Sequence, residues 1–168
     1  NENTILPFRY NPQIIIESIK RDPSSIKYAI EQDYSDELKN EILQIIMEAE
    51  PKVRLDSDSL PFMRSNYEYI THSLEGATPE EIKNVLDSVL ITGKFGYQVR
   101  DSYQILDLVS QYILEDKYSP SRNIDPYILK HVLKSEKLFI KALQSDFPLL
   151  KDSYFAMDEY SKEDQEII

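Results

Sequence analysis

The chain has 168 residues, of which 41% are hydrophobic and 29% charged, and it carries a net charge of −11. This length and composition are typical of one globular domain that buries its own core. The negative charge disfavours generic nucleic-acid binding, because that affinity comes largely from Lys and Arg side chains that neutralise phosphates. The absence of cysteine excludes a disulfide scaffold, a thiolate nucleophile and cysteine-ligated metal sites.

A motif that recurs along the chain predicts a repeat. Leu-Pro-Phe at residues 6–8 recurs at residues 60–62, and the two copies are followed by Asn11 and Asn66. A weaker third copy begins at Ser119. Recurrence of this kind is typical of proteins built from stacked supersecondary units. We therefore predict a single domain of helical-repeat units at about residues 5–58, 59–117 and 118–157, followed by an acidic tail at 158–168.

The first unit is predicted to contain three helices. Pro12 is expected to begin the first helix and Asp22-Pro23 the second. Proline lacks an amide hydrogen, and it is tolerated in the first turn of a helix because amides there have no intrahelical partner. A third, longer helix is expected over residues 36–50, with Ser35 as its N-cap. Its apolar residues recur at helical spacing, namely Leu38, Ile42, Ile45 and Ile46.

The second unit is predicted to follow the same plan. Thr78 and Glu81 have the spacing of a capping box, which marks the start of a helix. A long helix is predicted over residues 102–116 with Asp101 as its cap, and Gly93 stands where the preceding helix would end in a left-handed residue. The helix after Thr78 has one apolar stripe, made of Ile82, Val85, Leu86, Val89 and Leu90.

The third unit is predicted to begin with a helix that opens at Pro126 and matches the first helix of the first unit without a gap. It lacks an obvious long helix, and a shorter one over residues 147–157 is expected to cap the stack. Each unit also contains an Ile-Lys pair in its second helix. The pairs are Ile26-Lys27, Ile82-Lys83 and Ile140-Lys141.

Helices with one apolar face must bury it against other helices. We therefore predict an all-α fold in which about three helical-hairpin units stack into a short solenoid or an irregular bundle. A closed bundle that records an ancestral duplication is the alternative. The chain has no apolar run near the roughly 20 residues that span a bilayer. We expect a soluble, cytoplasmic protein without membrane contact and, because the chain begins with Asn1, a fragment of a larger one.

The segment from residue 12 to residue 29, PQIIIESIKRDPSSIKYA, resembles short helical repeats of unknown function found in bacterial and viral proteins. Those repeats combine an aliphatic pair, a short polar break and an aliphatic residue followed by Lys-Tyr-Ala. The likeness is looser over residues 126–143 and poor over residues 66–86, where Asn84 and Val85 replace the Tyr and Ala. The resemblance implies helical repeats and transfers no catalytic residue.

No motif for catalysis or cofactor binding stands out. His72 and His131 correspond in the repeat to within about a residue, which favours structural roles over a metal site. Carboxylates such as Asp101 and Asp107 have no spacing that distinguishes an acid–base pair. Residues 93–96 contain two glycines but lack the length and the final Ser or Thr of a phosphate loop. We predict no catalytic residue, no cofactor and no metal.

Two residue types are candidates for partner binding. The chain has twelve tyrosines and no tryptophan, and tyrosine is favoured at interfaces because its apolar ring carries a polar tip. Codon bias toward tyrosine is the alternative explanation. The lysines of the three Ile-Lys pairs would offer an anionic partner equivalent contacts, or would simply shield packed helices from water. The predicted partner-binding residues are Tyr67, Tyr97, Tyr103, Tyr118, Tyr127, Lys27, Lys83 and Lys141.

These patterns predict a non-catalytic protein-interaction or scaffold module, whose protein partner and oligomeric state the sequence does not identify. An accessory or regulatory domain of a bacterial or phage enzyme, with its active site outside this chain, is the alternative. A third hypothesis, an autonomous enzyme that uses carboxylates, requires a pocket that gathers two or more acidic residues.

Overall fold

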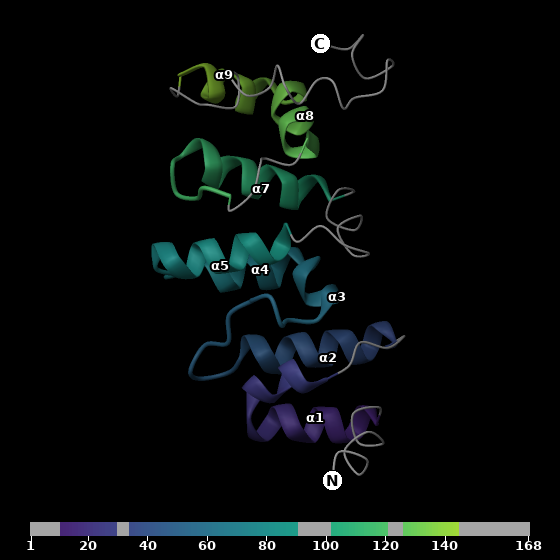
Figure 1. Ribbon diagram of the computed structural model, residues 1–168. Helices are drawn as coiled ribbons and strands as arrows, with labels where there is room; N and C mark the ends of the chain where they lie inside the picture. The colour runs from purple at the N-terminus through teal and green to yellow at the C-terminus, as the bar shows by residue number, and fades with distance from the viewer. Residues whose placement is uncertain (1–10, 30–33, 91–101, 121–125, 145–168) are drawn as a thin grey trace. The chain divides into compact units, whose positions relative to one another are not determined.

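The computed structural model of the chain describes residues 11–29, 34–90, 102–120 and 126–144. Within these ranges, all regular secondary structure is helical, which confirms the predicted all-α class (Figure 1). Stacking of the helices into a solenoid stays a prediction. None of the described helices is both long and apolar enough to cross a bilayer.

The chain divides into two compact units, an N-terminal unit at residues 1–99 and a C-terminal unit at residues 100–168. The helices of the N-terminal unit are α1 (Pro12–Arg21), the 3-10 helix η3 (Pro23–Tyr28), α2 (Asp36–Met47), α3 (Pro61–Arg64), α4 (Tyr67–Leu74) and α5 (Pro79–Val89). Helix α1 packs against η3 and α2, and α4 contacts α2, α3 and α5. These contacts completely bury Ile42, Tyr69 and Leu86.

The asparagine of the repeated motif is a helix N-cap in both described copies. The side chain of Asn11 accepts a hydrogen bond from the Gln13 amide at 3.0 Å, and the side chain of Asn66 accepts one from the Tyr69 amide at 2.8 Å. The backbone of both asparagines is extended, with nearly equal dihedral angles. The repeated motif therefore places a capping residue at the start of a helix.

The predicted second helix of the first unit is present, and it is a 3-10 helix. Asp22 caps this helix by accepting hydrogen bonds from both the amide and the hydroxyl of Ser24, at 3.0 and 2.7 Å. Local bonds of this kind from Ser and Asp side chains favour turns over a continuous α-helix. Among the apolar residues of this short helix, Ile26 is buried.

Several predicted helix boundaries are confirmed, whereas α2 ends earlier than predicted. The capping box of α5 is present, because the side chains of Thr78 and Glu81 each accept a hydrogen bond from the other residue's amide. Ser35 caps α2 as predicted. Helix α2 ends at Met47 and not at Glu50, which precedes a proline, and a residue in that position is disfavoured in the α conformation.

The C-terminal unit contains α7 (Tyr103–Leu114), α8 (Pro126–Lys134) and α9 (Glu136–Gln144), and each of these helices packs against the other two. The hydroxyl of Ser102 caps α7 by accepting a hydrogen bond from the Ile105 amide. The predicted cap, Asp101, lies outside the described residues. Helix α7 stops before the predicted end at Asp116, because the φ of 55° at Asp116 belongs to the left-handed region.

The three Ile-Lys pairs occupy different environments. Ile26 is buried, Ile82 is half-buried and Ile140 is 47% exposed. Ile26 and Ile82 stand four residues after the N-caps of their helices, whereas Ile140 stands five residues after Ser135, the N-cap of α9. One added residue turns a side chain by about 100° around an α-helix. The pairs therefore do not share one register relative to their caps.

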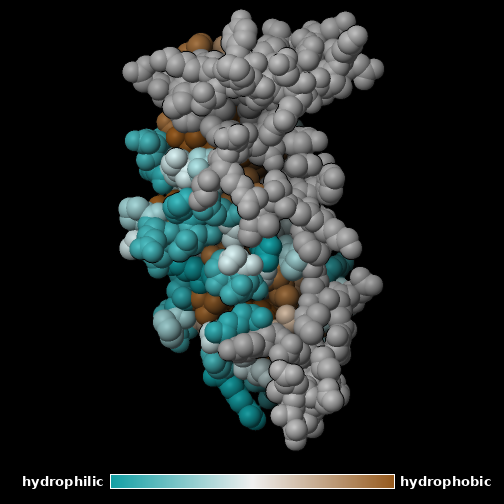
Figure 2. Space-filling view, viewed as in Figure 1, coloured by the Kyte–Doolittle hydropathy of each residue, from teal (hydrophilic) through white to brown (hydrophobic). Residues whose placement is uncertain are grey.

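The described part of the surface in Figure 2 is mostly hydrophilic, with separate hydrophobic patches. Among the described residues, four large hydrophobic side chains are exposed: Tyr67, Tyr103, Ile140 and Leu143. Three of the four belong to the C-terminal unit. The helix predicted over residues 147–157, the helix end at Gly93 and the acidic tail lie outside the described residues.

Candidate functional site

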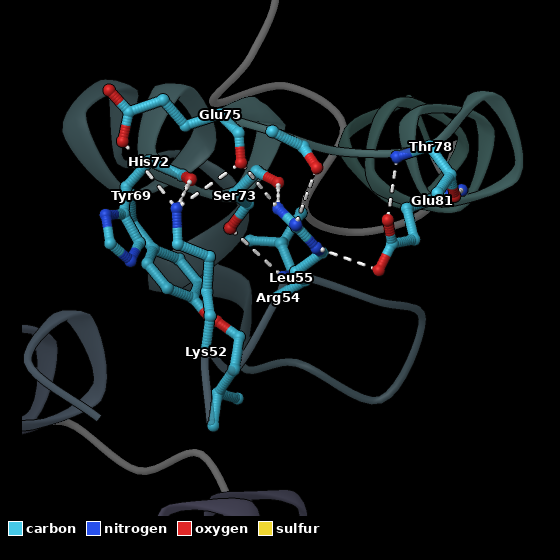
Figure 3. Close-up of polar contacts among 11 residues, drawn as sticks. Lys52, Arg54, Leu55, Tyr69, His72, Ser73, Glu75, Thr78 and Glu81 are labelled. Carbon is cyan, nitrogen blue, oxygen red and sulfur yellow. Dashed lines mark hydrogen bonds and ion pairs between the residues drawn. The ribbon is translucent and has the colours of Figure 1, made fainter. Parts of the chain in front are cut away.

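A polar cluster in the N-terminal unit ties the loop between α2 and α3 to the C-terminal end of α4 (Figure 3). Lys52 of this loop donates hydrogen bonds to the carbonyl oxygens of His72 and Glu75 and forms an ion pair with the Glu75 carboxylate at 3.6 Å. The last carbonyl groups of a helix lack intrahelical partners and lie at the negative end of its dipole. Lys52 therefore stabilises the end of α4.

Arg54 makes the most extensive contacts in this cluster. Its guanidinium donates hydrogen bonds to the carbonyl oxygens of Ser73, Glu75 and Gly76 and to the carboxylate of Glu81. The planar guanidinium offers five donors in a fixed arrangement, which suits several acceptors at once. Gly76, with a φ of 63°, supplies the left-handed residue that turns the chain from α4 toward α5. Arg54 thus joins the loop to both helices.

Two further hydrogen bonds hold the same loop from the core side. The Leu55 amide donates to the hydroxyl of Ser73 at 3.1 Å, and the Tyr69 hydroxyl donates to the Val53 carbonyl at 3.0 Å. Burial raises the pKa of Tyr69 well above its ordinary value, so the hydroxyl stays a donor at any physiological pH. The hydroxyl groups of Ser73 and Tyr69 therefore stabilise the position of this loop.

His72 borders the cluster, and its Nε2 is buried without a hydrogen bond to the described residues. Burial, followed by the positive charge of Lys52, lowers the pKa of His72. A hydrogen bond from the Thr78 backbone lowers the pKa of Glu81. At neutral pH the imidazole is therefore neutral, and the Glu81 carboxylate is ionised and paired with Arg54 at 3.0 Å.

A second cluster joins α7 to α8 in the C-terminal unit. The His131 side chain is only 4% exposed, and its Nε2 lies 3.6 Å from Oδ1 of Asp107. The side-chain amide of Gln111 donates to Oδ2 of Asp107 at 2.6 Å. The ring of Tyr103 meets the His131 imidazole edge to face, with centroids 4.8 Å apart. Gln111 thus orients the carboxylate, and His131 orients the aromatic ring, whereas the buried Nε2 of His131 makes no hydrogen bond with the described residues.

The groups of this second cluster that could bind another molecule are at the surface. Tyr103 is 69% exposed and the Asp107 side chain 42% exposed, whereas the imidazole between the helices is buried. Tyr103 and Asp107 stand one helical turn apart and so share a face of α7. The described residues contain no group of three or more His, Cys, Asp or Glu that could hold a metal ion. The cluster presents an oriented aromatic ring beside an anion.

The predicted tyrosines have unequal positions. Tyr67 is 37% exposed and Tyr103 is 69% exposed, so both present their rings to solvent. Tyr118 is 5% exposed, so its ring is buried. Tyr97 lies outside the described residues, as does the side chain of Tyr127.

The predicted lysines belong to three different helices. Lys27 is exposed on η3. Lys83 pairs with Asp87 one turn along α5, at 2.9 Å. Lys141 of α9 pairs with Glu115 at the end of α7 and so joins two helices of the C-terminal unit. A common lysine surface for an anionic partner stays a prediction.

No sequence pattern indicates the cluster around Lys52 and Arg54, because both residues bind acceptors some 20 residues along the chain, through tertiary contacts. The pair of exposed side chains on α7, Tyr103 and Asp107, has a weak signal in the sequence. Tyr103 is one of the predicted binding residues, and Asp107 follows it at the spacing of one helical turn. Helical spacing around an exposed aromatic residue would have identified the pair.

Comparisons with protein family models, with curated proteins and with solved structures found no match to this chain. The resemblance of residues 12–29 to short helical repeats therefore stays a prediction. The two clusters and the exposed side chains are the features of the chain that bear on its function.

Proposed function

We propose that this chain is a non-catalytic protein-interaction module that contacts a protein partner through the face of α7 that carries Tyr103. The observation that carries the proposal is that Tyr103 is 69% exposed while its ring contacts the buried His131. An aromatic side chain that is already held in place loses little conformational freedom when a partner covers it. Tyrosine is also among the residues that contribute most to binding at interfaces.

Helix α9 supplies a second exposed apolar position in the same unit. Ile140 and Leu143 are 47% and 59% exposed and stand one turn apart. Lys141 between them in sequence pairs with Glu115, so a charged pair accompanies the apolar side chains. A mixture of exposed apolar anchors and polar neighbours is typical of protein interfaces.

The contacts of the polar cluster around Lys52 and Arg54 also support a scaffold role. Lys52, Arg54 and Tyr69 direct their polar groups mainly at backbone carbonyls. Such bonds stabilise helix ends and connections and leave those groups committed to the fold. The shape and surface of the helices are then what the chain offers to other molecules.

A photo-cross-linking amino acid placed at position 103 tests the proposal. We expect discrete covalent adducts with one or a few proteins when the full chain is irradiated in its native cells. The same amino acid at Glu17, exposed on α1, is the matched control. Adducts that are identical from both positions, or none from position 103, would contradict the proposal.

A further inference from the structure

We infer that Tyr103 and Asp107 together form a recognition site for a cationic side chain, an arginine or a lysine, in a basic segment of a protein partner. The inference rests on the proposed function and adds the chemistry of the partner to it. It starts from two exposed groups of opposite character that α7 holds side by side.

Two side chains contact the pair, one from α8 and one from α7. His131 contacts the Tyr103 ring with its imidazole and lies 3.6 Å from Oδ1 of Asp107. Gln111 binds the other oxygen, Oδ2, at 2.6 Å. Gln111 therefore orients the carboxylate and His131 the ring before any partner arrives, and each carboxylate oxygen retains lone-pair capacity for a further donor.

The chemistry of the pair suits a cation. The face of an aromatic ring attracts an ammonium or guanidinium group, and a carboxylate beside it adds an ion pair and hydrogen bonds. A cation already lies near a ring of α7, because Nζ of Lys117, just past the end of the helix, is 5.8 Å from the ring centroid of Tyr112. A guanidinium is the better fit, since its plane stacks on a ring while its edge binds a carboxylate.

The charge of the surroundings favours the same occupant. The chain carries a net charge of −11, which attracts basic segments. Within the described residues, Glu115 at the other end of α7 pairs with Lys117 and Lys141. Asp107 by contrast contacts the neutral Gln111 and the buried His131. Among the described residues, no Lys or Arg pairs with Asp107, and its carboxylate is 42% exposed to a cation from outside.

Nuclear magnetic resonance titration of the purified full chain with N-acetyl-arginine amide tests the inference. We expect saturable shifts of the backbone amides around residues 103–107. The uncharged isostere N-acetyl-citrulline amide should cause much smaller shifts at equal concentration. Tyr103→Leu and Asp107→Asn should each weaken the arginine affinity by about threefold or more, because each removes one of two modest contacts.

Glu68→Gln provides a matched control, because it removes one exposed carboxylate from α4, next to Tyr67. It should leave the arginine affinity unchanged. Circular dichroism should show native helicity in all three variants, since the substituted side chains are partly or largely exposed. Equal shifts from arginine and citrulline, or unchanged affinity in both site variants, would overturn the inference.

The two proposals fail separately. Cross-links from position 103 that fall in a partner segment without arginine or lysine would refute the cationic recognition site and leave the interaction module standing. Saturable arginine binding at Tyr103 and Asp107 in a chain that cross-links no protein would refute the interaction module instead.

Discussion

The guanidinium of Arg54 binds carbonyl groups at the end of α4 that no helical amide reaches, and it also pairs with Glu81 at the start of α5. Its side chain is 21% exposed, and its hydrogen bonds to Ser73 and Glu81 are partly buried, whereas those to Glu75 and Gly76 lie at the exposed surface. Hydrogen bonds to a charged donor contribute more to stability than neutral ones, and a buried acceptor left without its donor is unfavourable. Single side chains of this kind determine how the loop before α3 is held.

Replacement of Arg54 by methionine should lower the free energy of unfolding by about 2 kcal/mol, because several carbonyl oxygens lose their donor together. Arg54→Lys should recover only part of this loss, since an ammonium cannot reproduce the planar fork. Urea denaturation followed by circular dichroism measures both values. Lys83→Met, which breaks an exposed pair within α5, should change stability by less than about 0.5 kcal/mol. Equal losses from Arg54→Met and Lys83→Met would contradict this assignment.

Glu115 should contribute a pH-dependent stability. Hydrogen bonds from Lys117 and then Lys141 lower the pKa of Glu115 to about 2. A carboxyl group with a lowered folded-state pKa stabilises the fold above its unfolded value of about 4.3, and this contribution is lost as the pH falls toward 2. Because the Glu115 side chain is 33% exposed, the contribution should stay below about 1 kcal/mol.

The variant Glu115→Gln should therefore be less stable than the wild type at pH 6 and equally stable near pH 2. Thermal melts at a series of pH values measure this difference. Glu17→Gln, exposed on α1, is the control and should show no comparable convergence. A difference between Glu115→Gln and the wild type that is constant from pH 6 to pH 2 would contradict the account.

Side chains close in sequence determine where a helix ends, whereas side chains far apart in sequence determine how helices pack. Ser35 and the Thr78–Glu81 capping box were predicted correctly, because a cap depends on residues three positions apart. The burial of Tyr118 and the contacts of Arg54 could not be predicted, because they depend on how separate helices pack. The candidate site lies between these cases, since α7 aligns Tyr103 with Asp107 but α8 supplies His131.

Asn66→Ala should destabilise the fold by about 1 kcal/mol, because the Tyr69 amide loses its capping acceptor at the start of α4. Asn66→Asp should retain most of the stability, since a carboxylate also caps and favours the positive end of the dipole. Denaturant titration provides the values. The control Asn84→Ala, exposed within α5, should be neutral or slightly stabilising. A loss at Asn84 equal to that at Asn66 would show that the cap is unimportant.

The two compact units differ in what their described side chains do. The described polar groups of the N-terminal unit are concentrated in contacts that hold its own loop and helix ends. The C-terminal unit exposes Tyr103, Ile140 and Leu143 and places a carboxylate beside the first of them. We therefore assign partner binding to the C-terminal unit, on the proposal that the chain acts through its surface.

The most direct test is the affinity of the chain for the partner captured at position 103. Isothermal titration calorimetry with the purified partner should show that Tyr103→Ala weakens binding by about tenfold or more, as expected for an aromatic residue central to an interface. Gln104→Ala, the exposed neighbour on the same helix, should leave the dissociation constant nearly unchanged. An unchanged dissociation constant for Tyr103→Ala would contradict the proposal that this face of α7 binds the partner.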